Sequence, residues 1–195
     1  MSQQLKTTIA VVDIETGATV DDPTIKPLVF QVGIAFGDTK GQIHKEVEFT
    51  LPFAEQVELG YIMQQDTVDW YNETEERAEL LPEYVQASLA VEEDLYTIMH
   101  KIRDAFLVNK LSNSQLLVCA NSPRFDLLIL RHLFNDTEVS QPWDFRQEFD
   151  YRTARTLAKA KGLELEESKS HRAIEDASEQ YYAMIKMCNH LGVEL

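Results

Sequence analysis

A short apolar run near the start of the chain, residues 9–12 with the sequence Ile-Ala-Val-Val, leads straight into acidic residues. A run of this length and β-branched content is typical of a strand that is buried on both faces. Residues 116–120, Leu-Leu-Val-Cys-Ala, form a second run of the same kind. Strands buried on both faces need helices above and below their sheet, so the chain is expected to fold as helical layers around a central sheet.

The remaining apolar patterns complete this plan. Further strands are predicted at residues 28–36, 42–51 and 145–150. Helices are predicted over residues 95–106, 125–134, about 151–161 and 172–190, with short helices and loop over 63–80. This order predicts an α/β fold with a mixed five-stranded sheet, in which a three-strand meander is followed by alternating helices and strands, flanked by helices. With 195 residues and 44% hydrophobic side chains, residues 1–195 are expected to form a single domain.

Charge limits the ways in which this chain can bind other molecules. Its 33 acidic and 18 basic residues give a net charge of −15, so surface charge alone cannot hold a polyanion, and a nucleic-acid partner would need local positive charge such as metal ions. The two cysteines, Cys119 and Cys188, lie far apart, which excludes a disulfide framework or a zinc ribbon and suits a reducing compartment. No stretch reaches the roughly 20 apolar residues that span a bilayer, and we expect no membrane partner and a cytoplasmic location.

Two acids follow the first predicted strand. Asp13 and Glu15 are two residues apart, so on an extended backbone both carboxylates project from one face while Ile14 points to the other. Two neighbouring anions favour a bound cation. The alternative is a chance pattern, because Asp-x-Glu triplets are common and residues 136–138 form a second one without a preceding strand.

A third acid follows the second buried run. Asp126 ends the segment Asn-Ser-Pro-Arg-Phe-Asp, residues 121–126, at the expected start of a helix. An acid in this position commonly caps a helix or complements its dipole. If residues 116–120 pair beside residues 9–12, however, Asp126 arrives close to Asp13.

His171 and Asp176 stand at the start of the last predicted helix. Five residues on a regular helix place two side chains about 140° apart, so these two converge only if His171 lies on the loop before the helix. Ser168 and Ser170 are typical helix-start residues and permit that arrangement. Taken alone the pair is a weak pattern, because one of five histidines can have an acid at this offset by chance.

In combination, these residues resemble the motifs of the DEDDh 3′-5′ exonucleases of the RNase H-like superfamily. The matching motifs are Asp-Ile-Glu-Thr at 13–16, Asn121 through Phe125-Asp126, and His-Arg-Ala at 171–173 through Asp176-Ala177. Asp-Thr-Val-Asp-Trp-Tyr at 66–71 and Asp-Tyr-Arg-Thr at 150–153 are most similar to the phage exonuclease A group and its bacterial 3′-5′ exoribonuclease-like relatives.

The resemblance covers about residues 9–190 and implies an RNase H-like fold, with the host cytoplasm as the location if a phage encodes the protein. One departure is Thr-Gly-Ala at 16–18, where Thr-Thr-Gly is common elsewhere in the superfamily, in the turn that normally meets the terminal nucleotide.

The resemblance also implies hydrolysis of phosphodiester bonds with two metal ions. In it, Asp13 bridges both ions and Asp126 binds one of them. Glu15 and Asp176 complete the site on the side of the attacking water, and His171 is the general base. Clustered carboxylates favour cations on chemical grounds as well, since oxygen-only ligands suit Mg²⁺ or Mn²⁺. The implied activity is stepwise 3′ to 5′ release of nucleoside 5′-monophosphates from single-stranded DNA or RNA with a free 3′ end.

Substrate contacts are expected at motif residues and at aromatic and basic side chains elsewhere, namely Ile14, Thr16, Trp70, Tyr71, Phe125, Arg152 and Arg172. Trp70 and Tyr71 are candidates to stack on the terminal base, with packing against the sheet as the alternative. Phe125 is expected to support Asp126. Arg152 belongs to a basic stretch that is a candidate phosphate track, and Asp150 before it is expected to cap a helix.

Two other functions fit the same residues. A phosphodiesterase specific for short oligonucleotides would use the same carboxylates, and a non-catalytic nucleic-acid-binding or interaction module would keep the fold without the reaction. Retention of all five catalytic residue types argues against the second. The sequence leaves open the choice between DNA and RNA, and the oligomeric state.

Overall fold

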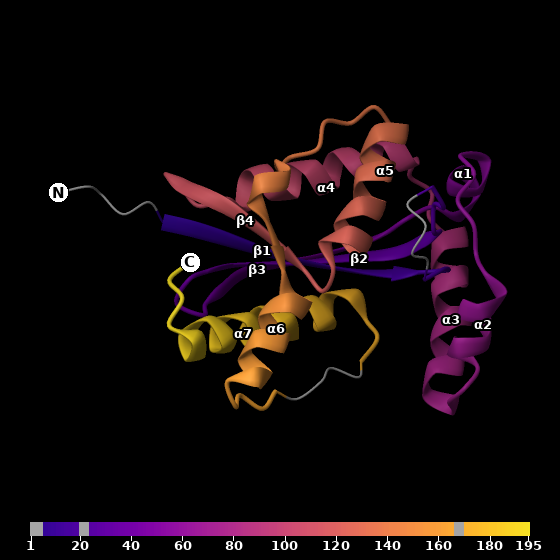
Figure 1. The fold of residues 1–195 in the computed structure, drawn as a ribbon. Helices are drawn as coiled ribbons and strands as arrows, with labels where there is room; N and C mark the ends of the chain where they lie inside the picture. The colour runs from indigo at the N-terminus through magenta and orange to yellow at the C-terminus, as the bar shows by residue number, and fades with distance from the viewer. Residues whose placement is uncertain (1–5, 20–23, 166–169) are drawn as a thin grey trace.

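The structure, a computed structural model, describes residues 6–19, 24–165 and 170–195. Its centre is a mixed five-stranded sheet with the strand order β3-β2-β1-β4-β5 (Figure 1). The strands are β1 (Lys6–Thr16), β2 (Val29–Asp38), β3 (Ile43–Thr50), β4 (Ser114–Ala120) and β5 (Glu148–Asp150). The first three form an antiparallel meander, and β4 and β5 continue the sheet parallel to β1. The predicted fold class is therefore confirmed.

Helices cover both faces of this sheet. They are α1 (Phe53–Glu58), α2 (Gln65–Tyr71), α3 (Glu75–Leu89), α4 (Leu95–Asn109), the π-helix η1 (Pro123–Leu127), α5 (Leu128–Asp136), the 3-10 helix η2 (Phe145–Gln147), α6 (Tyr151–Ala160) and α7 (Ala173–Leu191). In Figure 1, α4 and α5 lie on one face and α6 and α7 on the other, while α2 and α3 stand beside one end of the strands. Within the described ranges, no helix has both the length and the apolar character needed to cross a membrane.

Residues of β1 point alternately to the two helical layers. Ala10 and Val12 are buried in the core shared with α4 and α5, and Ile9 and Val11 in the core shared with α6 and α7. Strand β4 pairs with β1 only as far as Val12, opposite Ala120, whereas β2 stays paired to the end of β1. The last residues of β1 therefore have a free edge where β4 has ended, and their odd-numbered side chains face α7.

Helix α7 lies directly on β2. Gly33 has no side chain, and a Cβ atom there would stand 2.2 Å from the carbonyl carbon of Ala173. At Gly37, a Cβ atom would stand 2.4 Å from the ring of Tyr181. Because Gly33 is paired with Asp13 across the two strands, this close approach brings the first turn of α7 beside the acidic end of β1.

Some elements differ from the sequence prediction. The helix predicted over 125–134 begins earlier, with the π-helix η1. Strand β5 is shorter than predicted because η2, whose start is capped by the Asp144 side chain, takes the first half of residues 145–150. Helix α1 was not predicted, and α3 continues beyond residue 80 because Leu80 and Tyr84, four residues apart, bury one of its faces.

Candidate active site

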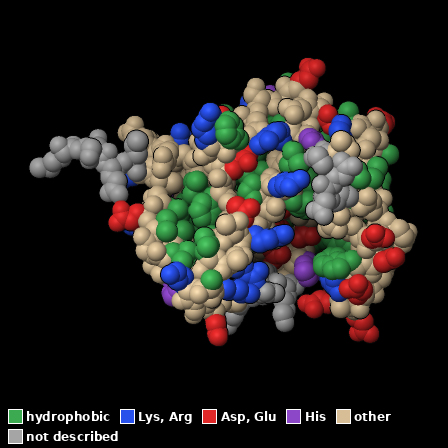
Figure 2. Space-filling view, in the orientation of Figure 1, with side chains coloured by type: hydrophobic (Ala, Val, Ile, Leu, Met, Phe, Trp, Pro, Cys, Tyr) green, Lys and Arg blue, Asp and Glu red, His purple; other side chains and the backbone are tan. Residues whose placement is uncertain are grey.

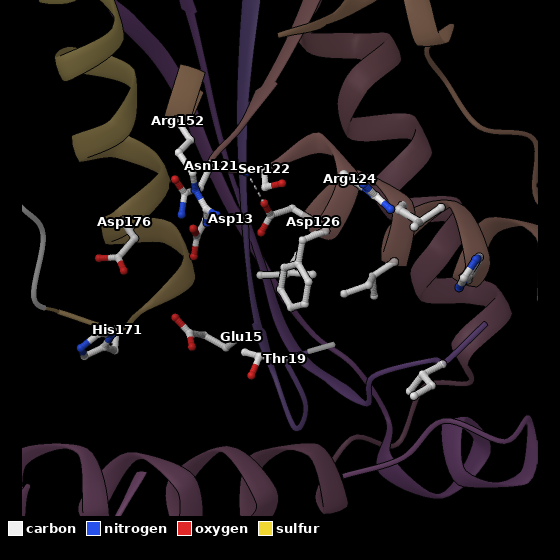
Figure 3. Close-up of a pocket in the computed structure, with 16 residues that line it drawn as sticks. Asp13, Glu15, Thr19, Asn121, Ser122, Arg124, Asp126, Arg152, His171 and Asp176 are labelled. Carbon is white, nitrogen blue, oxygen red and sulfur yellow. Dashed lines mark hydrogen bonds between the residues drawn. The ribbon is translucent and has the colours of Figure 1, made fainter. Parts of the chain in front are cut away.

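A cleft of about 810 Å³ opens beside the end of β4. Figure 2 shows it as a hollow with acidic side chains at its bottom, a histidine beside them and basic side chains along its rim. It is lined by all five predicted catalytic side chains, Asp13, Glu15, Asp126, His171 and Asp176 (Figure 3). Three distant stretches of the chain thus meet in one cavity.

Three of the four carboxylates form a compact group. Oxygen atoms of Asp13, Glu15 and Asp176 all lie within 4.8 Å of one another. The first two come from one face of β1, and Asp176 comes from the first turn of α7, which the contact at Gly33 holds against β2. Carboxylate oxygens at this spacing fit a divalent cation that takes oxygen ligands.

Each carboxylate of the compact group accepts a hydrogen bond from a neighbouring side chain. Gln180 Nε2 donates to Asp13 Oδ1 at 2.8 Å, and the Tyr71 hydroxyl donates to Glu15 Oε2 at 3.3 Å. The Ser170 hydroxyl donates to Asp176 Oδ1 at 2.5 Å. The donors come from α7, from α2 and from the loop before α7. They fix the directions in which the carboxylate oxygens face the cleft.

Asp126 is the fourth carboxylate and lies outside the compact group. It is buried in η1, and its Oδ2 accepts a hydrogen bond from the backbone N–H of Ser122 at 2.9 Å. The side chain therefore closes the turn that starts the helix, and it also lines the cleft beside Asp13 (Figure 3). A cation bound between Asp126 and Asp13 would have different ligands from one bound within the compact group.

Burial and mutual repulsion disfavour the charged forms of Asp13 and Glu15, and burial disfavours the charged form of Asp126. Burial, followed by repulsion from Glu15, raises the pKa of Asp13 well above its usual range. Burial and then Asp176 raise the pKa of Glu15 to about 8, and burial raises the pKa of Asp126 to about 7. A divalent metal ion is the natural counter-charge for such a cluster.

We expect the metal-free protein to lose stability as the pH rises from about 4 to about 8. Glu15 and Asp126 hold their protons more tightly in the folded chain, so their contribution to stability is fully present below their unfolded pKa values near 4 and is lost as the pH passes about 7 to 8. A bound divalent ion favours the charged carboxylates and reverses this loss. Thermal unfolding with EDTA or with Mg²⁺ at about pH 6 and about pH 8.5 measures it, and Mg²⁺ should raise the midpoint by several degrees more at the higher pH. An equal effect of Mg²⁺ at both values would contradict the assignment.

His171 reaches the cleft from the loop before α7, which begins at Ala173, and it thereby meets the condition for convergence with Asp176. Its backbone has a φ of 50°. Its ring stands edge-on to that of Trp70, with the centroids 5.2 Å apart. In Figure 3 the ring lies near the carboxylates of Asp176 and Glu15. A neutral imidazole in this place is suited to accept a proton from a water molecule in the cleft.

Three of the predicted substrate contacts line the cleft, namely Ile14, Phe125 and Arg152. Ile14 is also part of the buried core, and Phe125 packs against that core. Arg152 is exposed in the first turn of α6. The cap predicted for this helix is confirmed, because Asp150 accepts a hydrogen bond from the backbone N–H of Thr153 at 2.6 Å.

Two of the predicted contacts, Trp70 and Tyr71, are found beside the cleft lining. Tyr71 is buried and bonds to Glu15, so the structure favours packing for this ring. Trp70 is 38% exposed and has the Arg77 guanidinium 4.1 Å from its ring centroid, in addition to its contact with His171.

The other two, Thr16 and Arg172, make contacts within the protein. The Thr16 hydroxyl donates to the Ala18 carbonyl at 2.9 Å within the turn that follows β1. Arg172 donates to both carboxylate oxygens of Glu83 in α3, at 2.8 and 2.9 Å. Ser168, the other helix-start residue of the prediction, lies outside the described residues.

Several residues that line the cleft, among them Arg124 and His132, were not predicted, and neither were Gln180 and Tyr84, which bond to residues of the site. Gln180 lies four residues after Asp176, so its place on the same face of α7 could have been read from the spacing. Tyr84 donates from its hydroxyl to the backbone carbonyl of His171. That contact joins two segments far apart in the sequence, and no local pattern indicates it.

Comparisons with solved structures find the same fold in nucleases. Exonuclease I of E. coli, in a zinc-bound complex with single-stranded DNA, matches 94% of this chain and 40% of its own, with a TM-score of 0.66 and 18% identity. A product-bound structure of exonuclease I matches 95% of this chain and 43% of its own, with a TM-score of 0.62 and 19% identity. Cell-death related nuclease 4 (CRN-4) matches 93% of this chain and 64% of its own, with a TM-score of 0.64 and 16% identity. The chain thus spans about two fifths of the length of exonuclease I.

A comparison with curated proteins finds no match. The sequence model of a family described as the 3′-5′ exoribonuclease Rv2179c-like domain, by contrast, matches residues 8–187, nearly the whole chain. The chain therefore belongs to the Rv2179c-like 3′-5′ exoribonuclease domain family.

Proposed function

We propose that this protein releases nucleoside 5′-monophosphates one at a time from the free 3′ end of single-stranded nucleic acid, in a reaction that depends on two Mg²⁺ or Mn²⁺ ions. The observation that carries the proposal is the convergence of Asp13, Glu15 and Asp176 within 4.8 Å of one another, in a cleft that Asp126 and His171 also line. The raised pKa values of Asp13 and Glu15, two carboxylates of this group, fit metal ligands better than members of a solvated surface patch.

Different carboxylates of the cleft would bind the two metal ions. Asp13, Glu15 and Asp176 would hold one ion, and Asp13 and Asp126 the other. When bound, the ions supply the positive charge that an anionic phosphodiester needs as a nucleophile approaches and an alkoxide leaves. Tyr71 and Gln180 orient two of the carboxylates.

His171 would take the proton of the attacking water. The unprotonated ring nitrogen of a neutral imidazole can accept a proton from water. Its place beside Glu15 and Asp176 puts it next to the ligands of the ion on the nucleophile side (Figure 3).

Substrate would lie along the rest of the cleft. Phe125 and Ile14 offer apolar surface to a base, and the exposed Arg152 offers positive charge to a phosphate. Exonuclease I binds single-stranded DNA oligonucleotides in its solved structures, whereas the family description names an exoribonuclease. Both DNA and RNA therefore belong in the test.

The test uses single-stranded RNA and DNA labelled at the 5′ end, with the 3′ end free or blocked by a 3′-phosphate. We expect a ladder of products shortened from the 3′ end, release of nucleoside 5′-monophosphates, and no products with EDTA or with the blocked end. Equal degradation of free and blocked strands, or full activity in EDTA, would contradict the proposal. Activity on dinucleotides but not on longer strands would favour the alternative oligonucleotide phosphodiesterase.

The state of the two cysteines indicates in which cellular compartment the protein works. Cys119 and Cys188 are both free and buried. Thiols that are left unpaired suit a reducing compartment, and we place the protein in the cytoplasm on that ground.

A further inference from the structure

The backbone of His171 adopts an unfavourable conformation. Its φ of 50° lies in the left-handed region, where a side chain crowds the backbone. Among the described residues, Asn113 and Glu138 are the other non-glycine residues with positive φ, and neither lines the catalytic cleft. A conformation of this kind persists only where the surrounding structure holds it.

Three contacts from α2 and α3 hold the segment around His171. The Tyr84 hydroxyl donates to the His171 carbonyl, the Trp70 ring meets the imidazole edge-on at 5.2 Å, and Glu83 binds the neighbouring Arg172 through both oxygens. These helices stand at the same end of the sheet as the start of α7 (Figure 1). None of these three holding residues lines the cleft.

The three contacts differ in how firmly they hold. The side chains of Glu83 and Arg172 are 51% and 38% exposed, and exposed ion pairs hold a segment weakly. Trp70 is partly exposed as well. Tyr84, in contrast, is fully buried, and its ring stacks on Phe30 with centroids 6.0 Å apart. Of the three contacts, the hydrogen bond from the Tyr84 hydroxyl therefore holds the His171 backbone most firmly.

We propose that Tyr84 is a positioning residue, whose hydroxyl locks the left-handed backbone of His171 and so keeps the imidazole turned into the cleft. This inference rests on the proposed role of His171 as general base. Helix α3 then supports catalysis by holding His171 in position, although none of its residues takes part in the reaction.

Tyr84→Phe tests this, because it removes the hydroxyl and keeps the ring and its stacking on Phe30. We expect kcat to fall roughly 10- to 100-fold, as for a base displaced by about 1 Å. KM and the Mg²⁺ concentration needed for half-maximal activity should stay unchanged, since no substrate or metal contact is lost. Tyr96→Phe, at an exposed tyrosine of α4, is the matched control and should leave kcat unchanged.

A double-mutant cycle with His171→Ala separates positioning from a general effect on the fold. If Tyr84 acts through His171, adding Tyr84→Phe to His171→Ala costs no further activity. A wild-type kcat for Tyr84→Phe, or the same fold-loss in both backgrounds, would overturn the positioning role. Wild-type turnover of His171→Ala would instead overturn the base assignment on which the proposal rests. The two failures are therefore distinguishable.

Discussion

Asp13→Asn should abolish turnover almost completely, by more than about 10⁴-fold, or roughly 5.5 kcal/mol of transition-state stabilisation. Asp13 belongs to the compact group and is also repelled by Asp126, so its charge would serve both proposed ion positions. Asparagine keeps the shape and an oxygen that accepts the bond from Gln180. The loss would therefore come from the missing charge. Single-turnover assays with labelled single-stranded RNA and DNA measure it.

The thermal stability of Asp13→Asn provides an independent test of the metal site. Removing a buried charge that its neighbours repel should leave the metal-free unfolding midpoint unchanged or raise it, while the stabilisation by Mg²⁺ should shrink. Asp104→Asn, at an exposed acid of α4, is the matched control and should change neither activity nor the effect of Mg²⁺. An Asp13→Asn protein with near wild-type turnover would refute the metal site.

His171→Ala should lower kcat by roughly 10²- to 10⁴-fold, the usual contribution of a general base. The four carboxylates remain, so the stabilisation by Mg²⁺ should persist, in contrast to Asp13→Asn. Steady-state assays and thermal unfolding with and without Mg²⁺ measure the two effects separately. His190→Ala, at an exposed histidine near the end of α7, is the control and should behave as wild type. A loss of the Mg²⁺ effect in His171→Ala would show that the ring serves the metal site instead.

The sequence predicted the sheet and the meeting of the acids in one cleft, because both follow from the order of the strands and from alternation along each strand. Alternation along a strand places Asp13 and Glu15 on one face, and the parallel pairing of β4 with β1 brings Asp126 to the same edge. Both rules can be applied once the order of the strands and helices along the chain is known. They do not say where each strand ends, and β1 continues past its apolar run because β2 remains paired with it as far as Thr16.

Other parts of the site depend on contacts that no local pattern records. The bond from Tyr84 to the His171 carbonyl forms only when α3 packs beside the start of α7. Trp70 and Tyr71 were predicted as candidates to stack on the terminal base, but the sequence could not separate a buried ring bonded to Glu15 from an exposed ring beside His171. The π-helix at η1 likewise arises where Asp126 turns back to bond the Ser122 backbone.

The bare backbone at Gly33 has a consequence for the order of events during synthesis. Asp13 and Glu15 belong to β1 and leave the ribosome well before Asp176, which belongs to α7. Since α7 must settle against Gly33 before Asp176 can join the others, a nascent chain carries an incomplete set of acids until α7 has been made. Until then the cleft lacks one of the carboxylates that the proposed metal site needs.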